Sequence, residues 1–157
     1  MTAFELLAPS EPLWEKVMDY AAHCSWRAGK ILAQRMSERA FSGWERVVAA
    51  HDADWICGFC VVARDDCIPG LSYTPYIGYL FVGEPYRGNR LSQRMISFAA
   101  EYLKTVGFSS VYLVSDHENL YEKYGFQVVD RQLAPWGKLQ KIYRLSFQAH
   151  HVPERQK

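Results

Sequence analysis

The sequence predicts an α+β fold, in which a mixed, mostly antiparallel central sheet contains one parallel pair of strands and is flanked by helices. Two helical patterns come early in the chain, and two β-rich segments joined by a tight turn follow them. Residues 76–114 then read as strand, turn, helix and strand, a crossover that joins parallel neighbours. At 157 residues without a linker or repeat, the chain fits one domain, expected over 1–147 with a polar tail at 148–157.

The N-terminal segment predicts one short strand and two amphipathic helices. Phe4 to Leu7 is a short apolar run, and Ser10 is a candidate N-cap for a helix with Pro12 in its first turn. Ser25 is a candidate cap for a second helix, which would end near Arg39. Apolar residues recur at helical spacing in the first of these helices: Leu13, Trp14, Val17, Met18 and Ala21.

A predicted antiparallel hairpin follows, with strands at Trp44 to His51 and Trp55 to Arg64. Its second strand contains a Cys-x-x-Cys pair, Cys57 and Cys60. Residues three apart on a strand face opposite sides of the sheet, so the two thiols are expected to diverge. No second Cys or His pair stands at zinc spacing, so we expect structural, reduced cysteines and no metal site.

The crossover begins with an apolar strand, Tyr76 to Val82, in which Gly78 indicates either a bulge or a close backbone approach. An amphipathic helix starts near Leu91, and Gly107 is a plausible left-handed stop. Val111 to Val114 supplies the parallel partner strand. Two more strands are expected to close the sheet: Phe126 to Val129 and Leu139 to Leu145.

The junction between the strand and the helix, Gly83 to Ser92, predicts a phosphate site. The first N–H groups of a helix lack partners and, with the positive end of the helix dipole, attract anions. Gly88 and Asn89 suit a tight turn, because both residue types tolerate left-handed backbone. Arg87 and Arg90 add positive charge at the same mouth. The alternative is a solvated loop with two surface arginines.

Two segments resemble motifs of the GNAT superfamily of N-acetyltransferases. Arg87 to Ser92 resembles its [Q/R]-x-x-G-x-[G/A] loop, although Arg90 stands where Gly is usual and Ser92 replaces Gly or Ala. Tyr121 to Phe126, YEKYGF, resembles the family's later helix, glycine and strand, and the two motifs occur in the family's order. The resemblance covers roughly Tyr76 to Leu145, and before that it is only architectural.

The resemblance implies a single acetyltransferase domain that moves the acetyl group of acetyl-CoA to a primary amine by direct attack in a ternary complex. It also implies that the parallel strands splay to admit the pantetheine arm. Tyr121 would lie beside the thioester sulfur as general acid, since a phenol near pKa 10 roughly matches a thiol near 8.5; the alternative is a packing role. The implied cofactor-binding residues are Phe81 and Val82 through their backbone, and Arg87, Gly88, Asn89, Arg90, Leu91 and Ser92 around the pyrophosphate.

The proton acceptor for the amine is left open by the sequence. His117 follows the strand and precedes Tyr121 by about one helical turn, and histidine titrates near neutral pH, so His117 is a candidate relay. A solvated loop histidine is the alternative, and it is the commoner role for such a residue. Asp116 and Glu84 are carboxylate alternatives, with Asp116 better suited to cap the short helix. A chain of water molecules could also serve.

The acceptor amine is not identified by the sequence. In the GNAT fold it would be framed by residues 26–44 and 65–76, which contain Trp26, Trp44, Tyr73, Tyr76, Asp65 and Asp66. Small amines, antibiotics with amino groups and peptide N-termini all remain open as partners, as does a homodimer.

Composition excludes several other classes. A net charge of +1 gives no electrostatic footprint for nucleic acid. No apolar run reaches the length of a membrane span, and residues 1–12 lack the pattern of a secretory signal, so no membrane partner and a cytoplasmic location are expected. The absence of G-x-x-x-x-G-K-[ST] disfavours a P-loop enzyme. A non-catalytic acyl-CoA-binding or regulatory module of the same fold is the main alternative.

Overall fold

The computed structural model describes residues 1–147, which build one seven-stranded sheet in the order β1-β2-β3-β4-β5-β7-β6. Two short 3-10 helices, η1 and η2, lie in its connections. The predicted order of strands and helices is confirmed. The elements are β1 (Ala3–Leu7), α1 (Leu13–His23), α2 (Arg27–Ser37), β2 (Arg46–Asp52), β3 (Trp55–Ala63), β4 (Tyr76–Val82), η1 (Glu84–Tyr86), α3 (Leu91–Val106), β5 (Ser110–Ser115), η2 (Tyr121–Tyr124), β6 (Gln127–Leu133) and β7 (Leu139–Ser146).

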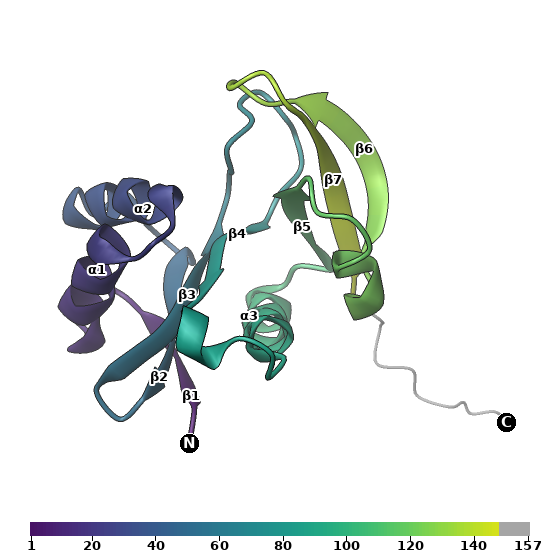
Figure 1. Ribbon diagram of the computed structural model, residues 1–157. Helices are drawn as coiled ribbons and strands as arrows, with labels where there is room; N and C mark the ends of the chain where they lie inside the picture. The colour runs from purple at the N-terminus through teal and green to yellow at the C-terminus, as the bar shows by residue number, and fades with distance from the viewer. Residues whose placement is uncertain (148–157) are drawn as a thin grey trace, which may run out of the picture.

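The sheet is antiparallel except between β4 and β5, as the sequence predicts. These two parallel strands pair only at Tyr76 and Tyr112, where the Tyr112 N–H donates to the Pro75 carbonyl at 2.8 Å. Beyond that point the strands separate, and β5, β7 and β6 bend away from the rest of the sheet (Figure 1). Because of this splay, the facing edges of β4 and β5 do not hydrogen-bond to each other beyond the paired position.

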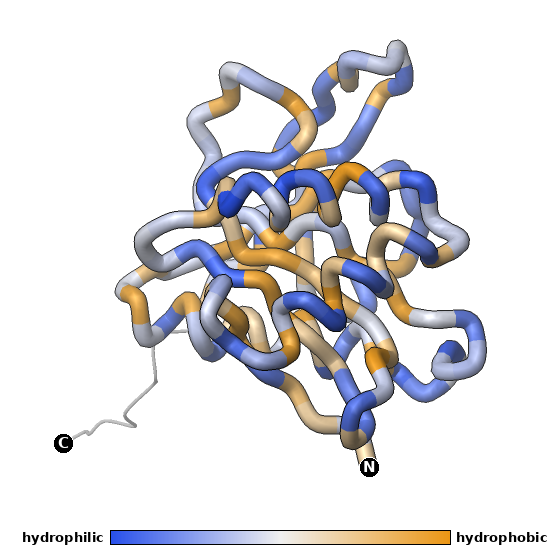
Figure 2. Tube along the Cα trace, turned by 90° about the vertical axis from the view of Figure 1, so that its left-hand side faces the viewer, coloured by the Kyte–Doolittle hydropathy of each residue, from blue (hydrophilic) through white to orange (hydrophobic). Residues whose placement is uncertain are grey.

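Two apolar cores lie on opposite faces of the sheet. Helices α1 and α2 cover one face of β1 to β4, and α3 covers the other face (Figure 1). Apolar residues recur every three or four positions on α1 and α3, so each helix buries one stripe against the strands. Figure 2 shows hydrophobic segments through the middle of the trace and mostly hydrophilic ones in the peripheral loops.

A β-bulge in β4 starts the splay. Phe59 pairs with Phe81 and Val61 pairs with Gly78. The chain advances by three residues in β4 but by only two in β3 between these pairs, so β4 contains one extra residue. Tyr79 has a φ of 51°, and it is this residue, not Gly78, that adopts the left-handed conformation. Gly78 instead accommodates a side chain that rests on it.

The predicted divergence of the two cysteines in β3 is wrong. Ala50 pairs with Gly58 and His51 with Ile56, so Cys57 is an extra residue in the strand. This bulge breaks the two-residue alternation, and Cys57 and Cys60 both face the core beneath α3. Both thiols are free.

Neither predicted serine cap forms. The residues before α1 and α2 are Pro12 and Trp26, and no side chain caps either helix. The Ser25 hydroxyl donates to the Glu84 carboxylate, which fastens the connection between α1 and α2 to the segment after β4.

Candidate active site

The splay between β4 and β5 opens into a cleft of about 450 Å³. Residues 77–80 of β4 form one wall, and residues 113–117 with Tyr121 form the other. The N-terminal turn of α2 and the β6–β7 turn border the opening. The structure therefore brings the two predicted catalytic residues, Tyr121 and His117, into one cleft.

Tyr121 begins η2 and is 6% exposed. Its ring lies among three others, with ring centroids 5.5 Å from Tyr143 and 6.1 Å from Tyr124 and Phe126. Burial raises the pKa of Tyr121 to about 12, against a smaller opposing effect of the Ser115 hydroxyl. The phenol therefore stays protonated at neutral pH, which is the form a proton donor needs.

His117 is exposed and lies in the loop before η2, not on a helix as expected. Its backbone N–H donates to the Ser115 hydroxyl at 3.0 Å, and its backbone carbonyl accepts from the Tyr143 hydroxyl at 3.0 Å. The ring centroids of His117 and Tyr121 are 6.2 Å apart. Backbone contacts thus fix the loop, while the imidazole itself faces the cleft.

Both carboxylate alternatives already have partners, and only Asp116 lines the cleft. Asp116 pairs with Lys138 at 3.3 Å and does not cap η2, whose N-cap position is Leu120. Glu84 accepts from the Ser25 hydroxyl, and this hydrogen bond lowers the pKa of the Glu84 carboxyl. Glu84 also lines a different hollow, next to α1 and the β2–β3 turn.

The predicted phosphate loop places its left-handed residues at Gly88 and Arg90, with φ of 88° and 58°. Asn89 was expected in that conformation and does not adopt it. Arg90 fills the N-cap position of α3 and offers no side-chain cap, so the first-turn N–H groups, from Leu91 onward, stay available to an anion. A left-handed N-cap explains why glycine suits this position in similar loops.

The two arginines of the loop behave differently. Arg87 folds back, so that its Nε donates to the Val82 carbonyl at 2.8 Å and its guanidinium lies 5.4 Å from the centre of the Phe81 ring. Arg90 is exposed, and among residues 1–147 its side chain has no hydrogen bond or ion pair.

The edge of β4 near the loop is partly free. The Gly83 N–H donates to the Cys57 carbonyl at 2.8 Å, so Gly83 faces β3. The backbone N–H and C=O groups of successive strand residues point to opposite sides. Those of Phe81 therefore point toward β3, like those of Gly83, and those of Val82 point toward β5. The Val82 N–H is therefore exposed to the splay.

The two motifs singled out in the sequence touch each other. Ser92 in the first turn of α3 and Tyr124 in η2 approach through their hydroxyl groups at 3.3 Å. Tyr124 is three residues from Tyr121, so this contact sets the phosphate loop beside the cleft.

Asp66 is the cleft residue whose placement the sequence does not reveal. The sequence shows it only as one of two adjacent acids, Asp65 and Asp66, on the expected acceptor side. The structure folds the segment after β3 across β4, and the half-buried Asp66 carboxylate lies over Gly78. Burial raises the pKa of this carboxyl to about 7. Its neighbour Asp65 is exposed and lines another groove, with Trp44 and Tyr73.

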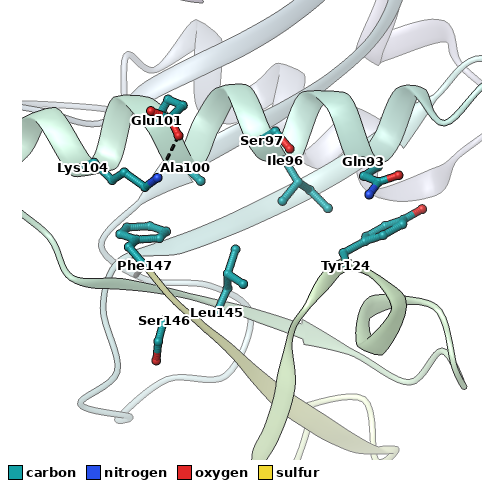
Figure 3. Close-up of a pocket in the computed structure, with 10 residues that line it drawn as sticks. All are labelled: Gln93, Ile96, Ser97, Ala100, Glu101, Lys104, Tyr124, Leu145, Ser146 and Phe147. Carbon is teal, nitrogen blue, oxygen red and sulfur yellow. Dashed lines mark hydrogen bonds and ion pairs between the residues drawn. The ribbon is translucent and has the colours of Figure 1, made fainter. Parts of the chain in front are cut away.

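Figure 3 shows a separate hollow of about 310 Å³ between α3 and the end of β7. Phe147 and Tyr124 lie below the helix at its two ends, with Leu145 between them. None of the predicted site residues lines it. The described part of the chain contains no cluster of three or more metal-ligating side chains, and none of its helices is long and apolar enough to span a membrane.

Comparison with known proteins decides the family. Residues 43–128 match the model of the acetyltransferase (GNAT) domain, a stretch that includes β2 to η2 and both motifs. The chain belongs to the GNAT acetyltransferase family. No curated protein matches this GNAT chain significantly in sequence.

Solved structures share the fold. A protein assigned to the GNAT family from Desulfovibrio desulfuricans superposes with a TM-score of 0.70 at 16% identity, covering 93% of this chain and 99% of its own. Aminoglycoside 6'-N-acetyltransferase with bound coenzyme A gives 0.69 at 19%, covering 98% and 99%. PaiA N-acetyltransferase from Thermoplasma acidophilum, also with coenzyme A, gives 0.64 at 14%, covering 94% and 99%.

Proposed function

We propose that this protein is an N-acetyltransferase that moves the acetyl group of acetyl-CoA to a primary amine by direct attack in a ternary complex. The contact between Ser92 and Tyr124 carries the proposal, because it sets an anion-binding helix start beside the cleft that holds Tyr121. Family membership and the coenzyme A bound in structures of the same fold support it.

The residues present suit acetyl-CoA. The pyrophosphate would take the first-turn N–H groups of α3 and the loop of Arg87, Gly88, Asn89 and Arg90. The pantetheine arm would lie along the free edge of β4, where the Val82 N–H can donate to an amide. The backbone contact predicted for Phe81 does not fit this arrangement, because its backbone groups turn toward β3; its buried ring stacks on Trp26 at 5.9 Å in the core behind β4. The acetyl group would then reach the cleft.

Tyr121 is assigned as the acid in this proposal. The amine nitrogen forms a bond to the acetyl carbon, the carbon–sulfur bond breaks, and the departing thiolate takes the phenolic proton of Tyr121. Its pKa of about 12 keeps the donor protonated at neutral pH. Because a thiol near pKa 8.5 is the stronger acid, transfer to sulfur is uphill, and it is completed when the phenolate takes up the proton that the amine nitrogen loses. His117 faces the same reacting groups and would relay a proton or contact the acceptor.

Two measurements test the proposal. Acetyl-CoA should raise the melting temperature of the protein, whereas ATP and NAD at equal concentration should not, because only a ligand of the native state stabilises it. Release of free thiol with a panel of amines then tests turnover. Binding without thiol release from any amine would favour the non-catalytic acyl-CoA module, and the absence of binding would refute both.

A further inference from the structure

Asp66 lies on the β4 wall of the cleft, with its carboxylate held against the backbone. A Cβ atom on Gly78 would be 3.2 Å from Oδ1 and 3.3 Å from Oδ2 of Asp66. Glycine at this position therefore leaves the space that the carboxylate fills. Among residues 1–147 the Asp66 carboxylate takes part in no ion pair.

Strand register sets Asp66 and Tyr121 at the same level of the cleft. Tyr76 pairs with Tyr112, so Gly78 under Asp66 and Val114 are both two residues beyond the last paired position. Ser115 follows directly, and its hydroxyl interacts with Tyr121. A group between the two walls thus meets a carboxylate on one side and a phenol on the other.

The mouth of the cleft is apolar. Ile31 of α2 is 55% exposed and Trp136 of the β6–β7 turn is 57% exposed, and both line the opening together with Trp26. Exposed side chains of this size in a cleft mark a surface for an apolar ligand. The other carboxylate of the cleft, Asp116, forms an exposed ion pair with Lys138 at 3.3 Å. One unpaired carboxylate and an apolar rim therefore remain.

We propose that the acceptor is a monoamine carrying an apolar or aromatic group, and that Asp66 binds its ammonium group and takes its proton. This inference rests on the acetyl transfer proposed above. The ammonium gives one proton to Asp66, and the nitrogen lone pair then forms the bond to the acetyl carbon. The carbon–sulfur bond breaks, and the thiolate takes the proton of Tyr121. The second nitrogen proton returns to Tyr121 through solvent, and Asp66 releases its proton to solvent.

The ionisation of Asp66 suits this role, because a base works best when its pKa lies near the working pH. Burial brings the pKa of Asp66 to about 7 and that of Cys67 to about 12, and it also raises the pKa of Tyr76, so the thiol and phenol stay neutral. The charged and titratable groups around Asp66 are Arg35, Cys67 and Tyr76 on its own side, and Tyr79, Tyr121, His117 and the Asp116–Lys138 pair in the cleft.

The test compares phenethylamine and butylamine with spermidine and kanamycin as acceptors, using thiol release by the full chain. We expect the two monoamines, with phenethylamine ahead, to exceed the polycations in kcat/KM by at least about tenfold. Asp66→Asn should lower kcat/KM for phenethylamine at pH 7.5 by about 100-fold or more. Asp65→Asn, the same change one residue away on another groove, is the matched control and should stay near wild type.

The pH profile separates a base from a structural residue. Wild-type kcat/KM should rise with pH through about 7 as Asp66 ionises, and fall above the amine's pKa of about 10. Asp66→Asn should lose the acidic limb, whereas His117→Gln should keep it. Gly78→Ala, whose new methyl displaces the carboxylate by a few tenths of an ångström, should cause a smaller loss.

Thermal stabilisation by acetyl-CoA distinguishes failure of the inference about Asp66 from failure of the proposed acetyl transfer. If acetyl-CoA stabilises wild type and Asp66→Asn equally but polycations are preferred, or the acidic limb survives in Asp66→Asn, the inference about Asp66 is overturned while acetyl transfer stands. Turnover of none of the amines by the acetyl-CoA-bound protein would also overturn it. If acetyl-CoA does not bind at all, the proposed function fails first.

Discussion

Replacing Tyr121 with phenylalanine isolates one hydroxyl. The ring is held by three aromatic neighbours at 5.5–6.1 Å, so the phenylalanine ring should pack in the same place. Loss of the interaction with Ser115 should lower the free energy of unfolding by only about 1 kcal/mol. Loss of a proton donor should be much larger, on the order of 10²-fold to 10⁴-fold in kcat. This range corresponds to about 2.7–5.4 kcal/mol in the activation barrier.

The pKa of Tyr121 decides what the pH profile can show. An ordinary tyrosine, with a pKa near 10, would be half ionised at pH 10 and would impose an alkaline limb there. With the pKa raised to about 12, only about 1% of Tyr121 is ionised at pH 10, so its limb lies beyond the usual assay range. The Tyr121→Phe variant should therefore be slow at every pH tested, with the same profile shape as wild type.

The assay is thiol release at saturating acetyl-CoA and amine, with single-turnover measurements to show that chemistry limits the rate. The affinity for acetyl-CoA, measured by calorimetry, should change little. Turnover equal to wild type, with chemistry rate-limiting, would refute the assignment. Tyr121 would then be a packing residue, and solvent would protonate the thiolate.

Changes at three other positions have defined outcomes. Gly88→Val should weaken acetyl-CoA binding in calorimetry while the fold survives, because φ at Gly88 is 88° and a β-branched residue is strained there; unchanged affinity would remove the loop from the site. Arg90→Ala should raise the KM for acetyl-CoA in a salt-dependent way if the guanidinium reaches a phosphate, and identical salt profiles would show that it does not. Arg90→Gly should be more stable to urea than Arg90→Ala by about 1 kcal/mol, because only glycine relieves the left-handed N-cap. Asp66→Asn should melt several degrees above wild type at pH 8.5 and close to wild type at pH 4. Because burial raises the pKa of Asp66, its ionisation opposes folding, and wild-type stability falls as the pH rises from about 4 to 7. Equal melting temperatures of the two proteins at both pH values would contradict the burial of Asp66.

Local patterns were enough to predict the arrangement of elements. Apolar periodicity located α1 and α3, and β-rich runs bounded by turns located β2 to β5 to within a few residues. The strand, loop and helix order predicted the parallel pair. Such features depend on residues close together in the sequence.

Features that depend on contacts between distant segments were not predictable. The extra residue at Cys57 follows from its register with β2, which no strand pattern fixes. Arg87 folds onto Val82 and Phe81 because the short turn of η1 lies between them. Asp66 becomes a cleft residue only when its segment crosses Gly78. Sequence alone showed a glycine in a strand and an acid in a loop, with no signal that joined them.

The central claim, that acetyl-CoA lies along the β4 edge of the splayed cleft with its pyrophosphate on α3, is tested most directly by amide hydrogen exchange. Acetyl-CoA should slow exchange at the Val82 amide and at the first-turn amides Leu91 to Gln93, while ATP at equal concentration should leave them unchanged. Protection that is absent from these amides, or that instead falls on the hollow lined by Ser97, Glu101 and Phe147, would contradict it.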